Sequence, residues 1–315
     1  MTAPAGTGRI TLLTCAALVI VTATVGCSSE NSASKGFASQ NPHSERAIKD
    51  PLVFAAGDIA HCASGGDEST ARLLASTRGT VLTLGDNAYR DGTSEEFADC
   101  YDPSWGRYKH RTKPSPGNHD YQSEGAAGYF GYFGEAAGKP SRGYYSYDLG
   151  SWHVVSLNSN CEEVGGCDTS SPQARWLEAD LSGNADKRCT LAYWHHPLFS
   201  SGEEHGSTPE VKPLWETLYE AGADVVLSGH EHNYERFAPQ DPDGVADPER
   251  GIREFVVGTG GVSHYPILDP IANSKVHNDD TYGVLKLTLR SEGYDWRFVP
   301  VEGARFTDFG SARCH

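Results

Sequence analysis

The chain has 315 residues, a formal net charge of −16 from 26 Lys and Arg against 42 Asp and Glu, and 38% hydrophobic residues. Because an acidic surface repels nucleic-acid phosphates, we expect no nucleic acid as a structural partner, and an anionic substrate would need cations at its binding site. The length suits one large domain or two small ones, and the lack of an internal repeat or a second linker favours one.

Residues 1–26 have the pattern of an export signal. One charge, Arg9, precedes an apolar run from Ile10 to Val25, which is short and rich in Thr compared with the roughly 20 apolar residues that span a bilayer. The run ends in "TVGCSSE", which resembles a bacterial lipobox with Cys27 as the lipidated residue. We therefore expect an exported bacterial lipoprotein, held at the cell surface or membrane through lipid on Cys27. An uncleaved signal anchor is the alternative.

Residues 27–50 are polar and nearly free of large apolar side chains, which predicts a lipidated, flexible tether before a domain over residues 51–315. Six cysteines lie in that domain, and their even number favours disulfides over thiol chemistry in an exported chain. No CxxC spacing indicates a cysteine zinc site. Six cysteines allow about 15 pairings, so the connectivity stays open. Our preferred pairs are Cys62–Cys100, Cys161–Cys167 and Cys189–Cys314.

Five short apolar segments end in Gly or Pro followed by polar residues, which predicts buried strands with candidate ligands at their carboxyl ends. In chain order they are "LVFAAGDIAHC", "TVLTLGDNAYRDG", "KPSPGNHDY", "CTLAYWHHPLFSSGEEHG" and "ADVVLSGHEHNYER". Amphipathic patterns predict helices over residues 67–78, 171–181 and 209–222. Alternating strands and helices indicate an α/β fold, in which ligands bind beyond the carboxyl ends of the strands.

Two further segments, residues 143–159 and 282–301, have the pattern of hairpins that turn at Gly150 and near Gly293. They suggest a second, more antiparallel sheet packed on the first. Residues 123–138, rich in Gly and aromatic residues, and the polar and acidic residues 202–209 are expected to be loops that shape a pocket.

If the five strand ends meet, they bring together donors that are too many for one ordinary transition metal and about right for two. These are Asp58, Asp86, Tyr89, Asn118, His195, His230 and His232. Oxygen and imidazole donors without thiolate suit iron, manganese or zinc. Two ions about 3.5–4 Å apart need a shared ligand, which a carboxylate such as Asp86 can supply, and such a pair activates water for in-line attack on phosphorus. Each motif alone is weak, since an isolated HxH is more often a hydrogen-bonded loop, so the prediction depends on the whole set.

The set "GDIA", "GDNAY", "GNHD", "HHP" and "GHEH" resembles the calcineurin-like metallophosphoesterases, and the tyrosine of "GDNAY" resembles the purple acid phosphatase branch. The resemblance implies a four-layer α-β-β-α sandwich with two packed mixed sheets and a two-metal site at strand C-terminal ends. It implies that a first, ferric ion is held by Asp58, Tyr89 and His232. A second ion, Fe, Zn or Mn(II), is held by Asn118, His195 and His230, with Asp86 bridging. Ala60 stands where other branches have a histidine, which supports the tyrosine.

The resemblance also implies that His119 contacts the substrate and protonates the leaving oxygen. His205 resembles a second catalytic histidine of small members of the branch. His61 and His264 are candidates for the pocket wall, with an ordinary surface position as the alternative. His196 stands where the family has several residue types and is not predicted to act.

The predicted function is an exported, lipid-anchored phosphatase that hydrolyses phosphomonoesters by attack of a metal-bound hydroxide at an Fe(III)–M(II) centre. A phosphodiesterase or nucleotidase with the same two-metal site is the first alternative. A lipoprotein that uses the fold only for binding is the second. The sequence leaves the physiological substrate and the oligomeric state open.

Overall fold

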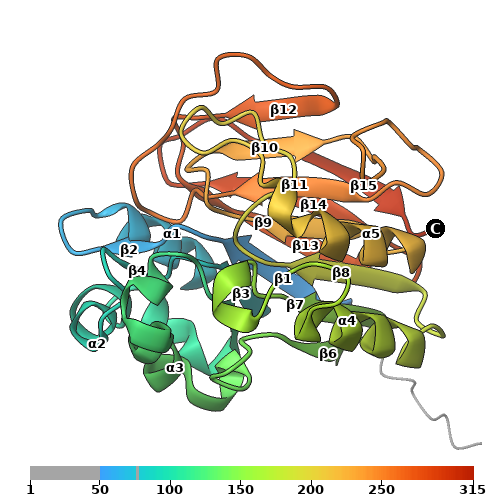
Figure 1. The fold of residues 1–315 in the computed structure, drawn as a ribbon. Coiled ribbons are helices and arrows are strands. Elements are labelled where there is room, and N and C mark those ends of the chain that lie inside the picture. The colour runs from blue at the N-terminus through green and yellow to red at the C-terminus, as the bar shows by residue number, and fades with distance from the viewer. Residues whose placement is uncertain (1–49, 76–77) are drawn as a thin grey trace, which may run out of the picture. The chain divides into compact units, whose positions relative to one another are not determined.

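The computed structural model describes residues 50–75 and 78–315 (Figure 1). The predicted signal peptide, the predicted lipidation site at Cys27 and the tether up to residue 49 lie outside the described residues. Within the described ranges, no helix is long and apolar enough to cross a membrane.

Two mixed sheets form the centre of the fold (Figure 1). The first has the strand order β15-β14-β13-β1-β3-β5. Its strands are β1 (Leu52–Ala56), β3 (Thr80–Leu84), β5 (Thr112–Ser115), β13 (Gly283–Arg290), β14 (Gly293–Pro300) and β15 (Phe309–Arg313). Strands β1, β3 and β5 are parallel, and β13 pairs antiparallel with β1.

The second sheet has the order β12-β10-β11-β9-β8-β7-β6. Its strands are β6 (Tyr145–Leu149), β7 (Trp152–Ser156), β8 (Cys189–Tyr193), β9 (Val225–Ser228), β10 (Tyr234–Phe237), β11 (Arg253–Val257) and β12 (Ser274–Asn278). Strands β7, β8, β9 and β11 are parallel neighbours. A two-stranded ladder of β2 (Ala60–His61) and β4 (Ala88–Tyr89) joins the loops that follow β1 and β3.

The period-two pattern of the central strands explains how the layers stack. In β8, Leu191 and Tyr193 belong to the core between the two sheets, whereas Ala192 belongs to a second core on the other face. β9 repeats this alternation, with Val226 in the second core. Successive side chains of a strand point to opposite faces, so a strand covered on both faces is apolar throughout.

Helices α4 (Pro172–Gly183) and α5 (Lys212–Glu220) cover the outer face of the second sheet. α4 begins as its sequence predicts, with the Ser171 side chain accepting a hydrogen bond from the Ala174 amide and with proline at the first helical position. α1 (Gly66–Ala75) lies against β13 of the first sheet. The predicted helices over residues 67–78, 171–181 and 209–222 therefore match α1, α4 and α5, the last after a 3₁₀ turn over Pro209–Val211.

Two sequence predictions need correction. The hairpins over residues 143–159 and 282–301 exist as β6–β7 and β13–β14, but they do not form one second sheet. Each extends a different mixed sheet, because the edge strands of both sheets accept antiparallel partners. Residues 123–138 are not simply a loop, since they contain α3 (Ala127–Phe133), whose Tyr129, Phe130 and Phe133 are buried. A short helix, α2 (Ser94–Glu96), was also not predicted.

The three preferred cysteine pairings are all present as disulfides. The Cα–Cα distances are 4.8 Å for Cys62–Cys100, 5.1 Å for Cys161–Cys167 and 5.5 Å for Cys189–Cys314, within the usual range of about 4.4–6.8 Å. The last pair ties the C-terminus to the start of β8.

Candidate metal centre

The predicted ligands follow the carboxyl ends of strands from both sheets. Asp58, Asp86 and Asn118 come just after β1, β3 and β5 of the first sheet. His195 follows β8 of the second sheet, and the "GHEH" segment follows β9. Because the two sheets pack against each other, their carboxyl edges bring all of these loops to one place.

The first half of the centre contains Asp58, Tyr89 and His232. The Tyr89 hydroxyl oxygen lies 2.9 Å from Oδ1 of Asp58 and 3.2 Å from Nε2 of His232. His232 Nε2 is in turn 3.3 Å from Asp58 Oδ1. All three side chains are buried, so their polar atoms face one another rather than water.

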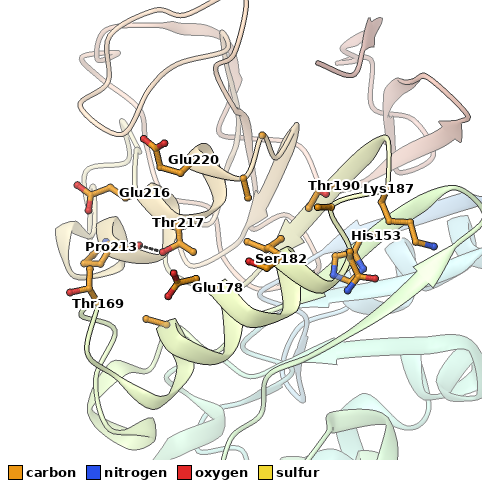
Figure 2. A pocket seen from close by; sticks show the side chains of 16 residues that line it. His153, Thr169, Glu178, Ser182, Lys187, Thr190, Pro213, Glu216, Thr217 and Glu220 are labelled. Atoms are coloured by element: carbon orange, nitrogen blue, oxygen red, sulfur yellow. Dashed lines mark hydrogen bonds between the residues drawn. The ribbon is translucent and has the colours of Figure 1, made fainter.

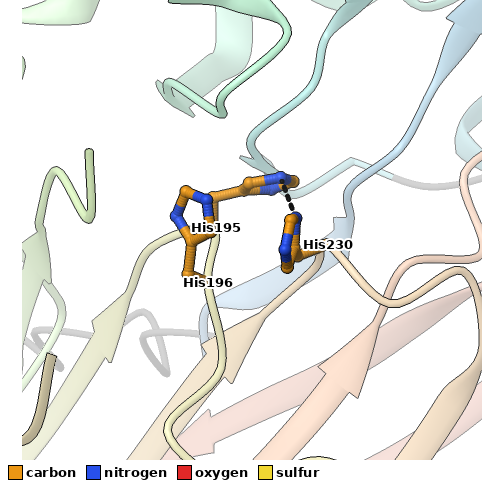
Figure 3. A group of neighbouring side chains, drawn as sticks. All are labelled: His195, His196 and His230. Atoms are coloured by element: carbon orange, nitrogen blue, oxygen red, sulfur yellow. Dashed lines mark hydrogen bonds between the residues drawn. The ribbon is translucent and has the colours of Figure 1, made fainter. Parts of the chain in front are cut away.

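The second half contains Asn118, His195 and His230. His195 Nε2 lies 3.0 Å from Oδ1 of Asn118 and 3.2 Å from Nδ1 of His230. Figure 3 shows the imidazoles of His195 and His230 facing each other from the loops after β8 and β9, with His196 beside them. Asn118 and His230 are half-buried, so this half is more accessible than the first.

One carboxylate oxygen joins the two halves. Asp86 Oδ2 lies 2.9 Å from the Tyr89 hydroxyl and 3.3 Å from His195 Nε2. Ligand atoms about 2.1 Å from one ion, at tetrahedral or octahedral angles, are about 3.0–3.4 Å apart. The separations between donors in both halves, 2.9–3.3 Å, therefore fit ions placed between them.

The remaining atoms of these side chains are held so that the donor atoms point inward. His195 Nδ1 lies 2.7 Å from the Leu84 carbonyl oxygen, which makes Nδ1 the protonated nitrogen and leaves the Nε2 lone pair free. Asp58 Oδ2 accepts the His230 amide at 2.9 Å, and Asp86 Oδ1 accepts the His119 amide at 2.8 Å. Each carboxylate thus keeps its second oxygen for the centre.

The backbone at the centre adopts conformations that cost free energy. Asp58, Asp86 and His230 have φ of 60°, 49° and 72°, in the left-handed region that side-chain-bearing residues rarely occupy. Such strain persists where surrounding structure enforces it and clusters at functional sites. Two glycines make the close approach possible, because a Cβ at Gly85 would lie 2.4 Å from the His195 ring and one at Gly117 would lie 2.1 Å from Asp86.

The charges of the centre call for cations. Burial raises the pKa of Asp86, but His195 and the other imidazoles outweigh burial and hold that pKa well below its usual range. Burial lowers the pKa of His195, yet Asp86 raises it to about 9 overall. Burial and then the Asp58 and Asp86 carboxylates raise the pKa of Tyr89 well above its ordinary value. Among the described residues, no Lys or Arg forms a salt bridge with either carboxylate, so bound metal ions would neutralise them.

The two predicted catalytic histidines lie on different sides of the centre. His119 Nδ1 faces the Arg90 carbonyl oxygen at 2.6 Å, and its Nε2 lies 3.9 Å from Asp86 Oδ2, so this nitrogen points to the junction of the two halves. The His205 ring stacks on His230 with centroids 4.1 Å apart. Both are therefore beside the predicted ions.

Among the described residues, neither the His61 nor the His264 side chain forms a hydrogen bond or a ring contact with the predicted ligands. His61 Nδ1 accepts the Ala63 amide in a turn, and His264 packs on the Tyr282 ring. Tyr265 was not predicted to lie at the centre, but its ring stacks on His232 with centroids 3.9 Å apart. Its place after "VSH" gives no signal of this role.

His196 and Glu231 were also missed. The ring nitrogens of His195, His196 and His230 include a set within 4.8 Å of one another, and His196 Nδ1 is fixed 2.7 Å from the Ser159 hydroxyl. Glu231 is fully buried, and its Oε1 accepts the amide of His205 at 2.7 Å. It therefore holds the loop that carries His205. His196 and Glu231 each stand next to a predicted ligand in the "HHP" and "GHEH" motifs, and this adjacency was the feature of the sequence that could have indicated their roles.

Comparisons with known proteins agree with this geometry. The family model described as calcineurin-like phosphoesterase matches residues 51–234. Purple acid phosphatase 21 of Arabidopsis thaliana is 30% identical over 241 residues, covering 68% of this chain and 51% of the relative. Purple acid phosphatase 15 of the same plant is 29% identical over 205 residues, covering 54% of this chain and 38% of the relative. The chain thus spans about half or less of the length of these relatives.

Two solved structures share the fold. The purple acid phosphatase PPD1 from yellow lupin (Lupinus luteus) seeds superposes with a TM-score of 0.64 at 17% identity, covering 84% of this chain and 53% of that one. GAP50, an anchor in the inner membrane complex of Plasmodium, gives 0.61 at 14% identity, covering 85% of this chain and 90% of that one. Since the family model matches more than half of the chain and the relatives are purple acid phosphatases, the chain belongs to the calcineurin-like phosphoesterase family, in its purple acid phosphatase-like branch.

Proposed function

We propose that this protein is a metal-dependent phosphatase that hydrolyses phosphomonoesters at an Fe(III)–M(II) centre. The observation that carries the proposal is the position of Asp86 Oδ2, within 3.3 Å of donors from both halves. When bound, two ions supply Lewis acidity to the phosphoryl oxygens and lower the pKa of water. The residues that would hold them are the seven predicted ligands, with Tyr89 as the donor that favours the ferric ion.

The protein's own side chains position and protonate the substrate. In hydrolysis, the bond from phosphorus to the alcohol oxygen breaks, a bond to the water oxygen forms, and the products are the alcohol and inorganic phosphate. His119 in its imidazolium form would carry a proton on both ring nitrogens: Nδ1 donates to the Arg90 carbonyl oxygen, and the Nε2 proton passes to the leaving alcohol oxygen. His205, stacked on His230 and anchored by Glu231, covers the second half.

We further propose that residues 1–26 are an export signal and that lipid on Cys27 anchors the domain outside the cytoplasm through the tether. The apolar run before "TVGCSSE" supports this. The test is mass spectrometry of the N-terminal peptide from cells that express the full chain. A lipid adduct on Cys27 that is absent in Cys27→Ser is expected, and an intact residue 1 in the purified protein would contradict it.

The activity is tested with metal analysis and with p-nitrophenyl phosphate against bis(p-nitrophenyl) phosphate. We expect about two metal ions per chain, one of them iron, and higher kcat/KM on the monoester. His119→Asn should lower kcat about 10²-fold without changing the metal content, because it removes a proton donor and no ligand. A higher kcat/KM on the diester would contradict the proposed monoesterase activity and indicate a phosphodiesterase. A metal-loaded protein that hydrolyses neither substrate would favour a binding role.

A further inference from the structure

A cavity of about 340 Å³ lies beside the second half of the centre. Two of its lining residues, Asn118 and His196, belong to the centre or contact it, so the cavity and the predicted ions share a wall. The rest of the wall comes from residues 121–122, 159–163, Thr208 and Glu210. We call this space the leaving-group cavity.

Part of the wall of the leaving-group cavity is held in place by contacts within the protein. The Cys161–Cys167 disulfide closes the loop that forms one side. The Ser159 hydroxyl accepts the His196 amide at 3.0 Å and lies 2.7 Å from the His196 ring. The Tyr121 hydroxyl accepts a hydrogen bond from Asn158 at 2.8 Å. A preformed wall of this kind can discriminate between substrates because little free energy is lost in ordering it.

The charged side chains of this wall are all acidic. Its charged side chains are Glu162, Glu163 and Glu210, and its lining contains no Lys or Arg. The other polar side chains include the neutral groups of Gln122, Asn160, Ser159 and Thr208. Carboxylates and amide or hydroxyl oxygens accept hydrogen bonds, and the carboxylates attract cations. A ligand group with positive charge and N–H donors fits this wall, and a second phosphate or a carboxylate does not.

The position of the cavity indicates which part of a substrate enters it. Bound ions would hold the phosphoryl group, and the alcohol would leave on the side opposite the attacking water. Asn118 and His196 belong both to the cavity wall and to the surroundings of the second half, so a group bound at that half lies next to the cavity. We infer that the alcohol part of the ester extends toward this wall.

We propose that the leaving-group cavity selects phosphomonoesters whose alcohol part carries a positive charge, such as the phosphates of amino alcohols, over those with further anionic groups. This inference rests on the proposed phosphatase function for the orientation of the substrate. The three carboxylates are exposed, so each contributes only a small factor, and together they should change kcat/KM about tenfold at low ionic strength.

The test uses three esters of nearly equal size: phosphoethanolamine, 2-hydroxyethyl phosphate and phosphoglycolate, with cationic, neutral and anionic alcohol parts. For the metal-loaded protein we expect kcat/KM to fall in that order. The triple variant Glu162→Gln, Glu163→Gln, Glu210→Gln should reduce the ratio between the first and last ester about tenfold. The neutral ester reports any general loss of activity.

A matched control removes the same charge elsewhere. Figure 2 shows the cavity between α4 and α5, lined in part by the exposed Glu178, Glu216 and Glu220, and this cavity shares no lining residue with the leaving-group cavity. Replacing these three by Gln should leave the substrate ratio unchanged. If both triple variants change the ratio equally, the effect comes from net charge and the inference is wrong.

Binding without turnover separates this inference from the proposed function. Calorimetry would compare 2-aminoethylphosphonate with phosphonoacetate, neither of which contains an ester bond. Tighter binding of the aminophosphonate, lost in the cavity variant, supports the inference even if no ester is hydrolysed, in which case the phosphatase proposal fails. Hydrolysis of all three esters with equal kcat/KM overturns the inference and leaves the phosphatase proposal intact.

Discussion

The two halves of the metal centre share Asp86 but differ in charge and exposure. The first half offers the Asp58 carboxylate and the Tyr89 phenol, both buried, whereas the second offers the neutral amide of Asn118 and two imidazoles and is partly open. Hard anionic oxygen donors favour a trivalent ion, and neutral donors favour a divalent one. The same set of strand ends therefore presents two unequal sets of donors, one buried and anionic and one partly exposed and neutral.

Asp86→Asn removes the negative charge that the two halves share and replaces one carboxylate oxygen by an NH2 group, and we expect the largest effect. Loss of the bridging charge should reduce the metal content of both halves and lower kcat/KM by about 10³-fold or more. Metal analysis and phosphate release on the purified variant measure the two effects. The exposed Asp186→Asn is the control for charge alone. A variant that keeps both ions and most activity would show that the halves do not depend on this carboxylate.

His230→Ala breaks the second half and leaves the first. We expect one ion per chain instead of two, a visible iron band that persists, and kcat/KM lower by about 10²-fold. The reason is that His230 is one of the four predicted ligands of the second ion, with Asp86 counted, while the predicted donors of the first ion are untouched. Loss of the band together with the second ion would show that the two halves load as a unit.

Tyr89→Phe breaks the first half more gently, because Asp58, Asp86 and His232 remain. The visible absorption that arises from phenolate bound to iron should vanish, with kcat lower by about tenfold. A spectrum recorded beside metal analysis separates loss of colour from loss of iron. Tyr121→Phe, whose hydroxyl bonds Asn158 outside the centre, should keep the band. A band that survives in Tyr89→Phe would remove the tyrosine from the ligand set.

The predicted ligand residues lie at strand ends that the structure brings to one place, whereas the two hairpins were wrongly assigned to one sheet. Asp58, Asp86 and His195 each lie two residues after the end of a short apolar strand, so the strand pattern and the ligand chemistry coincide at these positions. The division of the hairpins between two sheets was not predictable, since strand pairing across long sequence separations depends on the packed core. The stacking of Tyr265 on His232 was not predictable for the same reason.

The loop that carries His195 in the second half is held by a titratable carboxyl group, and we expect the smallest effect from its substitution. Glu254 is buried on β11 and accepts the amides of Leu198 and Phe199, just after His195. Burial raises the pKa of Glu254 to about 8. The Glu254 carboxyl of the unfolded chain loses its proton above its ordinary pKa of about 4.5, whereas the folded chain keeps that proton up to about pH 8. The stability that Glu254 contributes is therefore complete below a pH of about 4.5 and is lost as the pH rises toward 8.

The glutamine of Glu254→Gln cannot titrate. Between pH 5 and 8 the melting temperature of this variant should therefore fall less than that of the unmodified protein. The change in unfolding free energy over this pH range should differ between the two proteins by an amount on the order of 2–3 kcal/mol. The amide loses one of the two backbone hydrogen bonds, which costs about 1 kcal/mol at every pH and leaves the slope unaffected. The exposed Glu178→Gln should keep the original slope. At pH 6, where the carboxyl is neutral in the folded protein, activity should stay within about twofold, because the loop keeps most of its support. Identical slopes in Glu254→Gln and the unmodified protein would mean that the carboxylate is ionised in the folded state, held by the Leu198 and Phe199 amides, and that the second half is anchored by a charge as the first half is.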